Sequence, residues 1–201
     1  MDKKERVAVF GGTFNPPHMG HVRAAEALSR EIEPDKFLVV PSFIPPHKSV
    51  YESVTPEDRL NMSRLAFSHI ERVEISDIEI RRGGTSYTAL TLEELSKDGR
   101  ELYFLCGTDM FLTISSWFMP EKIFSLATIC YVRREDDKET EILLEQKKRE
   151  YEQKFAARII EIKCRPLVVS STEMRAASDN LNNEAFLSKA VCEYIKTRGL
   201  Y

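Results

Sequence analysis

Two histidines, His18 and His21, lie three positions apart in the segment GGTFNPPHMGH, which spans residues 11–21. This spacing places both imidazoles on one face of the first turn of a helix. A helix N-terminus carries partial positive charge and suits a phosphate, and two imidazoles would add hydrogen-bond donors where negative charge develops. The simpler alternative is a turn with two surface histidines. The combination of strand, glycines, prolines and paired histidines in one segment favours the functional interpretation.

The residues around the histidines predict the elements that must position them. Arg6–Phe10 contains a short apolar run that is typical of a buried strand. Gly11–Gly12 lets the backbone approach a ligand closely, and Pro16–Pro17 prevents a helix until both prolines are passed. We therefore expect a strand, a stiff turn, and a helix from about His18 to Glu31.

The composition is that of an ordinary globular protein of 201 residues, with 42% hydrophobic and 30% charged residues. The net charge of −3 gives no basic surface for nucleic acid, and no apolar run is long enough to span a membrane. The four cysteines are scattered, and we see no apolar leader at the N-terminus. We therefore expect a cytoplasmic protein with no nucleic-acid or membrane partner, and a homo-oligomer is possible.

Strand-like and helix-like segments alternate along the chain, which predicts an α/β fold: a Rossmann-like parallel sheet with helices on both faces, in one domain over residues 1–201. The expected strands are Arg6–Phe10, Lys36–Val40, part of Val73–Ile80, Glu101–Cys106, Thr128–Val132 and Ile159–Ile162. After the first helix, further helices are expected from Thr55-Pro56, from near Tyr87 to Gly99, over Glu139–Phe155, and from about Asn183 to Arg198.

Ligands of such folds bind beyond the carboxyl ends of the strands, and the unusual motifs of this chain fall there. Ser42–Lys48 is a proline-rich loop that ends in His47 and Lys48, two groups that could hold a phosphate. The segment Val169–Arg175 places Ser171, Thr172 and Arg175 at a helix start, which we interpret as a second anion site rather than simple capping.

Three further features have alternatives that the sequence leaves open. Gly83–Thr88 is expected to join a strand to a helix, where Ser86 or Thr88 either caps the helix or contacts a ligand. Asp109, which follows a buried strand, either caps a helix or accepts hydrogen bonds from ribose hydroxyls. Trp117 either packs in the core or stacks against a flat ring.

These motifs together imply several bound phosphates, yet there is no P-loop signature and no nucleophile beside a base. The consistent chemistry is nucleotidyl transfer, in which a bound phosphate attacks the α-phosphorus of a nucleoside triphosphate. Such reactions depend on positioning and on charge stabilisation.

At this point the motifs resemble a known family. GGTFNPPHMGH is similar to the H-x-G-H signature of the nucleotidyltransferase superfamily, and Val169–Arg175 is similar to its I-S-S-T-x-I-R motif. The PPHK loop, the Ser-Tyr-Thr block, Gly107–Asp109 followed by Trp117, and the C-terminal residues narrow the resemblance to bacterial nicotinate-nucleotide adenylyltransferases, over nearly the whole chain.

The resemblance implies that ATP and nicotinate mononucleotide, with Mg²⁺ accompanying ATP, give deamido-NAD and pyrophosphate. The implied catalytic residues are His18 and His21, and no metal ligand is assigned to the protein. The implied ATP-binding residues are Gly11, Gly12, Thr13, Phe14, His18, His21, Gly107, Asp109, Ser171, Thr172 and Arg175. The implied mononucleotide-binding residues are His47, Lys48, Ser86, Tyr87, Thr88, Asp109 and Trp117.

One departure bears on the chemistry, because Asn15 stands where the family often has Asp. If that acid helps to place the metal or a histidine, the reaction would be slower here. Two other functions share the scaffold: pantetheine-phosphate adenylyltransferase, which has the same His pair, and a nucleotide-binding regulator without turnover.

Overall fold

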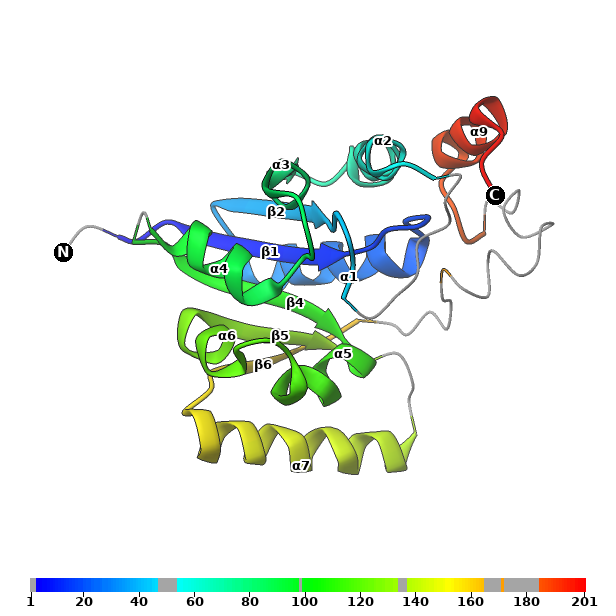
Figure 1. Cartoon of the computed structure of the whole chain (residues 1–201). Coiled ribbons are helices and arrows are strands. Elements are labelled where there is room, and N and C mark those ends of the chain that lie inside the picture. Colours follow the sequence, from blue (N-terminus) through cyan, green and yellow to red (C-terminus); the bar gives the residue numbers. More distant parts are fainter. Residues whose placement is uncertain (1–2, 47–53, 98, 134–136, 165–170, 172–184) are drawn as a thin grey trace.

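The computed structural model of the chain describes residues 3–46, 54–97, 99–133, 137–164, 171 and 185–201. Its centre is a six-stranded sheet in the order β3-β2-β1-β4-β5-β6, and every neighbouring pair is parallel (Figure 1). The strands are β1 (Arg6–Gly12), β2 (Lys36–Pro41), β3 (Val73–Ile75), β4 (Glu101–Gly107), β5 (Ala127–Val132) and β6 (Ile159–Ile162).

The strand order reverses direction between β1 and β4. From β1 the chain builds outward through β2 and β3, and it then returns to build β4, β5 and β6 on the other side of β1. In open parallel sheets, the crevice at the carboxyl ends of the strands beside such a reversal is where ligands bind. The turn that follows β1 therefore starts at the position where this architecture favours a ligand site.

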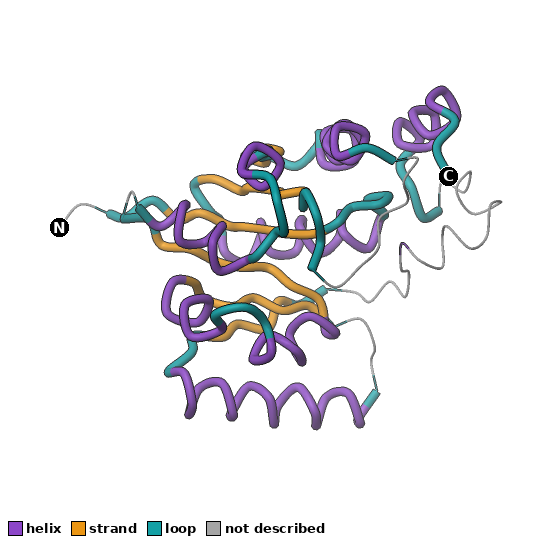
Figure 2. The backbone as a smooth tube through the Cα atoms, viewed as in Figure 1, coloured by secondary structure: helices purple, strands orange, loops and turns teal. Residues whose placement is uncertain are grey.

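Helices cover both faces of the sheet (Figure 2). They are α1 (Met19–Ile32), α2 (Pro56–Phe67), α3 (Ile78–Arg82), α4 (Thr88–Ser96), α5 (Thr108–Thr113), α6 (Pro120–Leu126), α7 (Lys138–Phe155) and α9 (Lys189–Arg198), with a 3₁₀ turn at Ile114–Ser116. Alternate residues of β1 enter opposite cores: Ala8 packs with α1, α2 and α9, and Val9 packs with α3 to α7. Burial of both faces accounts for the continuous apolar runs in the strand sequences.

The predicted α/β class and parallel sheet are confirmed. Each predicted strand segment also contains one strand of the sheet. Within Val73–Ile80 the strand predicted for part of the segment is β3, Val73–Ile75, and the second half begins helix α3. The sequence Ile78-Glu79-Ile80 alternates like a strand, but Ile78 and Glu79 are both buried against neighbouring elements and the Arg81 N–H donates to the Asp77 carbonyl at 2.8 Å.

The predicted last helix also began too early. Residues 185–188 are not helical, and α9 starts at Lys189 after Ser188, whose Oγ accepts the Val191 N–H at 3.4 Å. At α2 the prediction was right: Thr55 caps the helix, and its Oγ1 accepts the Asp58 N–H at 3.0 Å. Among the described residues, no helix is long and apolar enough to cross a bilayer.

Candidate active site

The turn after β1 is built around a close contact between Gly12 and Phe14. An ideal Cβ on Gly12 would lie only 2.9 Å from the Phe14 ring, whereas one on Gly11 would meet nothing closer than Phe104 at 3.7 Å. The Phe14 ring is 2% exposed and packs edge-on against Phe10. Internal packing against the Phe14 ring thus requires glycine at position 12.

The two histidines stack on each other at the start of α1. Their ring centroids are 3.7 Å apart. The backbone N–H of His18 donates to Nδ1 of the His21 ring at 3.1 Å. This bond uses Nδ1 as an acceptor, so a neutral His21 ring carries its proton on Nε2. His18 is the residue before the first helical turn and is 3% exposed, while His21 is half-buried with its ring against Phe14. The predicted pairing of the two imidazoles is confirmed.

The amide groups at this helix start are less available than the sequence suggested. The Met19 N–H donates to the Phe186 carbonyl at 2.7 Å, and the His21 N–H donates to the His18 carbonyl at 2.8 Å. These two donors are satisfied by the protein itself. A helix start whose amides are already bonded within the protein has fewer donors to offer an anion.

The late serine–threonine motif reaches the same turn. Ser171 Oγ donates to the Pro16 carbonyl at 3.0 Å, which joins the start of that motif to the segment before His18. Thr172 and Arg175 lie outside the described residues, as do His47 and Lys48 of the proline-rich loop.

Two of the predicted site residues lie at the carboxyl end of β4 and just beyond it. Gly107 is the residue before α5, and Asp109 is exposed in the first turn of that helix. Trp117 is half-buried beyond it, with its Nε1 donating to Thr113 Oγ1 at 3.3 Å and its ring 6.3 Å from that of Phe104. Phe104 therefore lies near both Trp117 and Gly11, at the carboxyl ends of the neighbouring strands β4 and β1.

The segment Gly83–Thr88 differs from its prediction in two respects. It joins helix α3, not a strand, to α4, and the residue before α4 is Tyr87, whose side chain makes no capping bond. Ser86 is 8% exposed, and its Oγ accepts the Phe43 N–H at 2.8 Å. The Tyr87 ring packs against Phe118 with centroids 4.5 Å apart. The Ser86 hydroxyl thus holds the loop after β2.

Sequence reasoning missed a buried arginine behind these loops. Arg59, in the first turn of α2, is 1% exposed and donates to carbonyls of Thr13, Ser42 and Phe43. No local pattern could have revealed it, because its partners come from two distant loops. It also missed the support of Asn15, which is 2% exposed and accepts a hydrogen bond from the Tyr201 hydroxyl.

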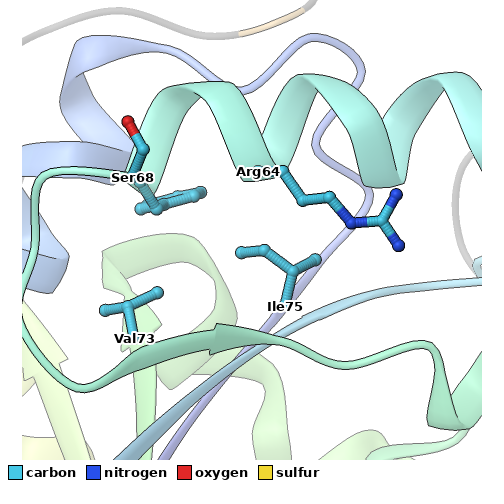
Figure 3. Close-up of a pocket in the computed structure, with 5 residues that line it drawn as sticks. Arg64, Ser68, Val73 and Ile75 are labelled. Atoms are coloured by element: carbon cyan, nitrogen blue, oxygen red, sulfur yellow. The ribbon is translucent and has the colours of Figure 1, made fainter.

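No group of three or more His, Cys, Asp or Glu side chains is arranged to hold a metal ion in the part of the chain that the structure describes. A pocket of about 220 Å³ lies between the end of α2 and edge strand β3, lined by Arg64, Phe67, Ser68, Val73 and Ile75 (Figure 3). None of these five is a predicted site residue, although the Phe67 ring packs edge-on against that of Phe14, with centroids 5.7 Å apart.

Known proteins resemble this chain in sequence and in fold. The cytidylyltransferase-like family model matches residues 9–177. Proteins named probable nicotinate-nucleotide adenylyltransferase from Desulfatibacillum aliphaticivorans and Caldicellulosiruptor saccharolyticus are 35% and 34% identical, over 98% of this chain and 99% and 98% of theirs. A solved structure of Plasmodium falciparum nicotinic acid mononucleotide adenylyltransferase complexed with NaAD has a similar fold, with a TM-score of 0.74 at 17% identity over 98% and 97% of the two chains. The chain therefore belongs to the cytidylyltransferase-like family of nucleotidyltransferases, among the nicotinate-nucleotide adenylyltransferases.

Proposed function

We propose that this protein transfers the adenylyl group of ATP to nicotinate mononucleotide in NAD biosynthesis. A phosphate oxygen of the mononucleotide forms a bond to the α-phosphorus of ATP, and the bond from that phosphorus to the bridging oxygen breaks, releasing pyrophosphate and deamido-NAD. The observation that carries the proposal is the stacked pair of His18 and His21 at the carboxyl end of β1, beside the reversal of strand order. Full-length similarity to nicotinate-nucleotide adenylyltransferases supports the choice of substrates.

The histidines would act by stabilising charge. Imidazole N–H groups at this turn would donate to the triphosphate and oppose the negative charge that grows as pyrophosphate leaves. A neutral His21 ring holds its proton on Nε2, because its Nδ1 accepts the hydrogen bond from the backbone N–H of His18. No general base is required in this scheme, since the attacking phosphate is already ionised at neutral pH.

The remaining predicted residues are assigned as binding groups. We assign the backbone of Gly11, Gly12, Thr13 and Phe14, together with Gly107, Asp109, Ser171, Thr172 and Arg175, to ATP. We assign His47 and Lys48 to the mononucleotide phosphate, Ser86, Tyr87, Thr88 and Trp117 to the nicotinate end, and Asp109 also to ribose. The bond between Ser171 and Pro16 supports a shared phosphate site, because it joins the late motif to the His turn.

Mg²⁺ would enter with ATP. The described residues offer no cluster of three metal-ligating side chains, and the triphosphate itself supplies oxygen ligands, which Mg²⁺ prefers. The ion would neutralise charge on the phosphates. We place the reaction in the cytoplasm, in one catalytic domain that spans the chain, and we leave its assembly as a monomer or a homo-oligomer to solution measurement.

Pyrophosphate release tests the proposal. The full chain is mixed with ATP, Mg²⁺ and one acceptor at a time: nicotinate mononucleotide, pantetheine phosphate, or buffer. Release with the first acceptor and formation of deamido-NAD by mass spectrometry would support it. Release only with pantetheine phosphate would indicate the related transferase, and ATP binding without release for either acceptor would indicate a regulator.

A further inference from the structure

The guanidinium of Arg59 bridges the two loops that the proposed function assigns to different substrates. Its Nη1 donates to the Thr13 carbonyl at 3.1 Å and to the Ser42 carbonyl, and its Nη2 donates to the Phe43 carbonyl at 3.0 Å. Thr13 belongs to the turn after β1, and Ser42 and Phe43 belong to the loop after β2, which leads toward residues 47 and 48. One planar group thus holds the ATP turn and the mononucleotide loop.

The environment of this cation is unusual for a residue with only a packing role. Arg59 is 1% exposed, and none of the ion pairs among the described residues includes it, although Tyr201 and Glu79 favour its charged form from beyond ion-pair distance. Burial lowers the pKa of Arg59, yet an arginine stays charged because its ordinary pKa is so high. Burying a charge is unfavourable, and an apolar side chain of similar volume would often serve stability as well. The presence of a buried guanidinium at this position is best explained by the three carbonyl groups to which it donates hydrogen bonds.

The same loops are tied together by further bonds around the guanidinium. The Ser42 N–H donates to the carbonyl of Gly12 at 2.9 Å, which links the loop after β2 to the last residue of β1, directly before the turn. The Phe43 N–H donates to Ser86 Oγ at 2.8 Å, which extends the frame to the segment before α4. A shift at Arg59 would therefore be transmitted to all three segments that surround the proposed site.

We propose that Arg59 is a positioning residue, whose fork sets the separation between the ATP turn and the mononucleotide loop. This inference rests on the proposed adenylyl transfer. The buried guanidinium touches neither substrate and acts through the carbonyls of Thr13, Ser42 and Phe43. Each loop would still bind its own substrate without it, but the attacking oxygen and the α-phosphorus would no longer be aligned. A displacement of about 1 Å at such a step lowers the rate by roughly a hundredfold.

Two substitutions separate the geometry of the fork from its charge. Arg59→Lys keeps the charge, but a single ammonium on a shorter side chain cannot hold carbonyls from both loops. Arg59→Met removes charge and donors while keeping much of the volume. We expect kcat to fall at least about tenfold in Arg59→Lys and about a hundredfold in Arg59→Met, with KM for ATP and for the mononucleotide each changed less than about fivefold.

Partial unfolding would also lower kcat, so kcat is expressed per binding-competent site. These sites are counted by calorimetric titration with a non-hydrolysable ATP analogue. The matched control is Leu60→Ala, which truncates a core residue beside Arg59 that is 2% exposed. It should lower the thermal midpoint but leave kcat per competent site within about twofold of the wild type, because it removes no bond to either loop.

The outcomes separate the two proposals. If the wild type releases no pyrophosphate with nicotinate mononucleotide, the proposed function is wrong and this inference is lost with it. If the wild type is active but Arg59→Lys keeps more than half of its kcat per competent site, the positioning role alone is overturned. A loss in Leu60→Ala as large as that in Arg59→Lys would also overturn it, since general destabilisation would then explain both.

Discussion

Ser171 Oγ donates a hydrogen bond to the carbonyl oxygen of Pro16 at 3.0 Å, although 155 positions separate the two residues in the sequence. Pro16 lies two residues before His18, and Ser171 is the third residue of the Val169–Arg175 motif. The bond therefore fixes the two proposed phosphate-binding segments relative to each other.

Ser171→Ala should weaken the use of ATP. Loss of this single hydrogen bond, worth about 0.5–1.5 kcal/mol, should lower kcat/KM for ATP by roughly three- to tenfold. Steady-state kinetics at saturating mononucleotide measure this. The control is Ser125→Ala on α6, whose hydroxyl bonds only within its own helix, to the Lys122 carbonyl. Equal kinetics for both variants would contradict the proposed link.

The stacked histidines should be indispensable for turnover. His18→Ala and His21→Ala should each reduce kcat by roughly a hundredfold or more, because donors aimed at developing charge are lost. His69→Ala is the matched control, since His69 is exposed and pairs with Glu26 on the outside of the fold. Circular dichroism should show that all three variants are folded. Near-normal rates in either site variant would remove the role that we assign to it.

Gly12→Ala should be more destabilising than Gly11→Ala. The new methyl group at position 12 would lie 2.9–3.2 Å from three atoms of the Phe14 ring, which is buried and has little room to move. Overpacking of this kind costs about 1–3 kcal/mol, whereas a methyl group at position 11 makes ordinary contacts. Urea unfolding midpoints measure the difference. Identical midpoints for the two variants would show that the Phe14 ring can yield.

Asp58 should make the stability of the fold fall in acid. Burial by itself would raise the pKa of Asp58, but hydrogen bonds from Thr55, Tyr194 and Arg198 outweigh it and lower the pKa below the ordinary value. A carboxyl group with a depressed pKa in the folded state contributes stability above its unfolded pKa of about 4, and this contribution disappears as the pH falls through the folded value.

Asp58→Asn should therefore lose about 1–3 kcal/mol at pH 7 and show a flatter decline below pH 4. Chemical unfolding at pH 3, 4, 5 and 7 measures both effects. Glu57→Gln is the control, since Glu57 is an exposed neighbour that pairs with exposed Arg64. A parallel acid decline in wild type and Asp58→Asn would show that other groups dominate.

The enzyme should prefer nicotinate over nicotinamide mononucleotide. The ring carboxylate would lie near Thr88, the first residue of α4, where a helix start favours negative charge. A charged hydrogen bond of about 1.5–3 kcal/mol corresponds to at least about tenfold in kcat/KM. Competition between the two mononucleotides measures the ratio, and equal efficiency would argue against this placement.

The turn after β1 could be predicted because its signals are local. An apolar run, two glycines and two prolines each restrict the backbone over a few residues, and the observed start of α1 differs from the prediction by one position. Helix α3 could not be predicted in this way. Its alternating sequence resembles a strand, and only the burial of Ile78 and Glu79 in the tertiary structure favours the helix.

The supporting residues of the site could not be predicted from the sequence either, because their roles depend on tertiary contacts. Arg59 follows a predicted helix start in a charged segment, which is typical of a solvated surface, and its carbonyl partners lie 46, 17 and 16 positions away. The Phe14 ring fills the space beside Gly12 only once the chain has turned. Local sequence patterns predict the helices and strands. The contacts of Arg59 and Phe14 depend instead on how segments come together in the folded protein.

The bond from the Met19 N–H to the Phe186 carbonyl has a consequence for synthesis of the protein. During translation, the His turn leaves the ribosome long before residue 186 has been added. A nascent chain can form β1 and α1 early, but the Met19 amide at the start of α1 needs water as its partner until residue 186 has emerged. The turn that carries the two histidines therefore reaches the geometry described here only after that late residue is available.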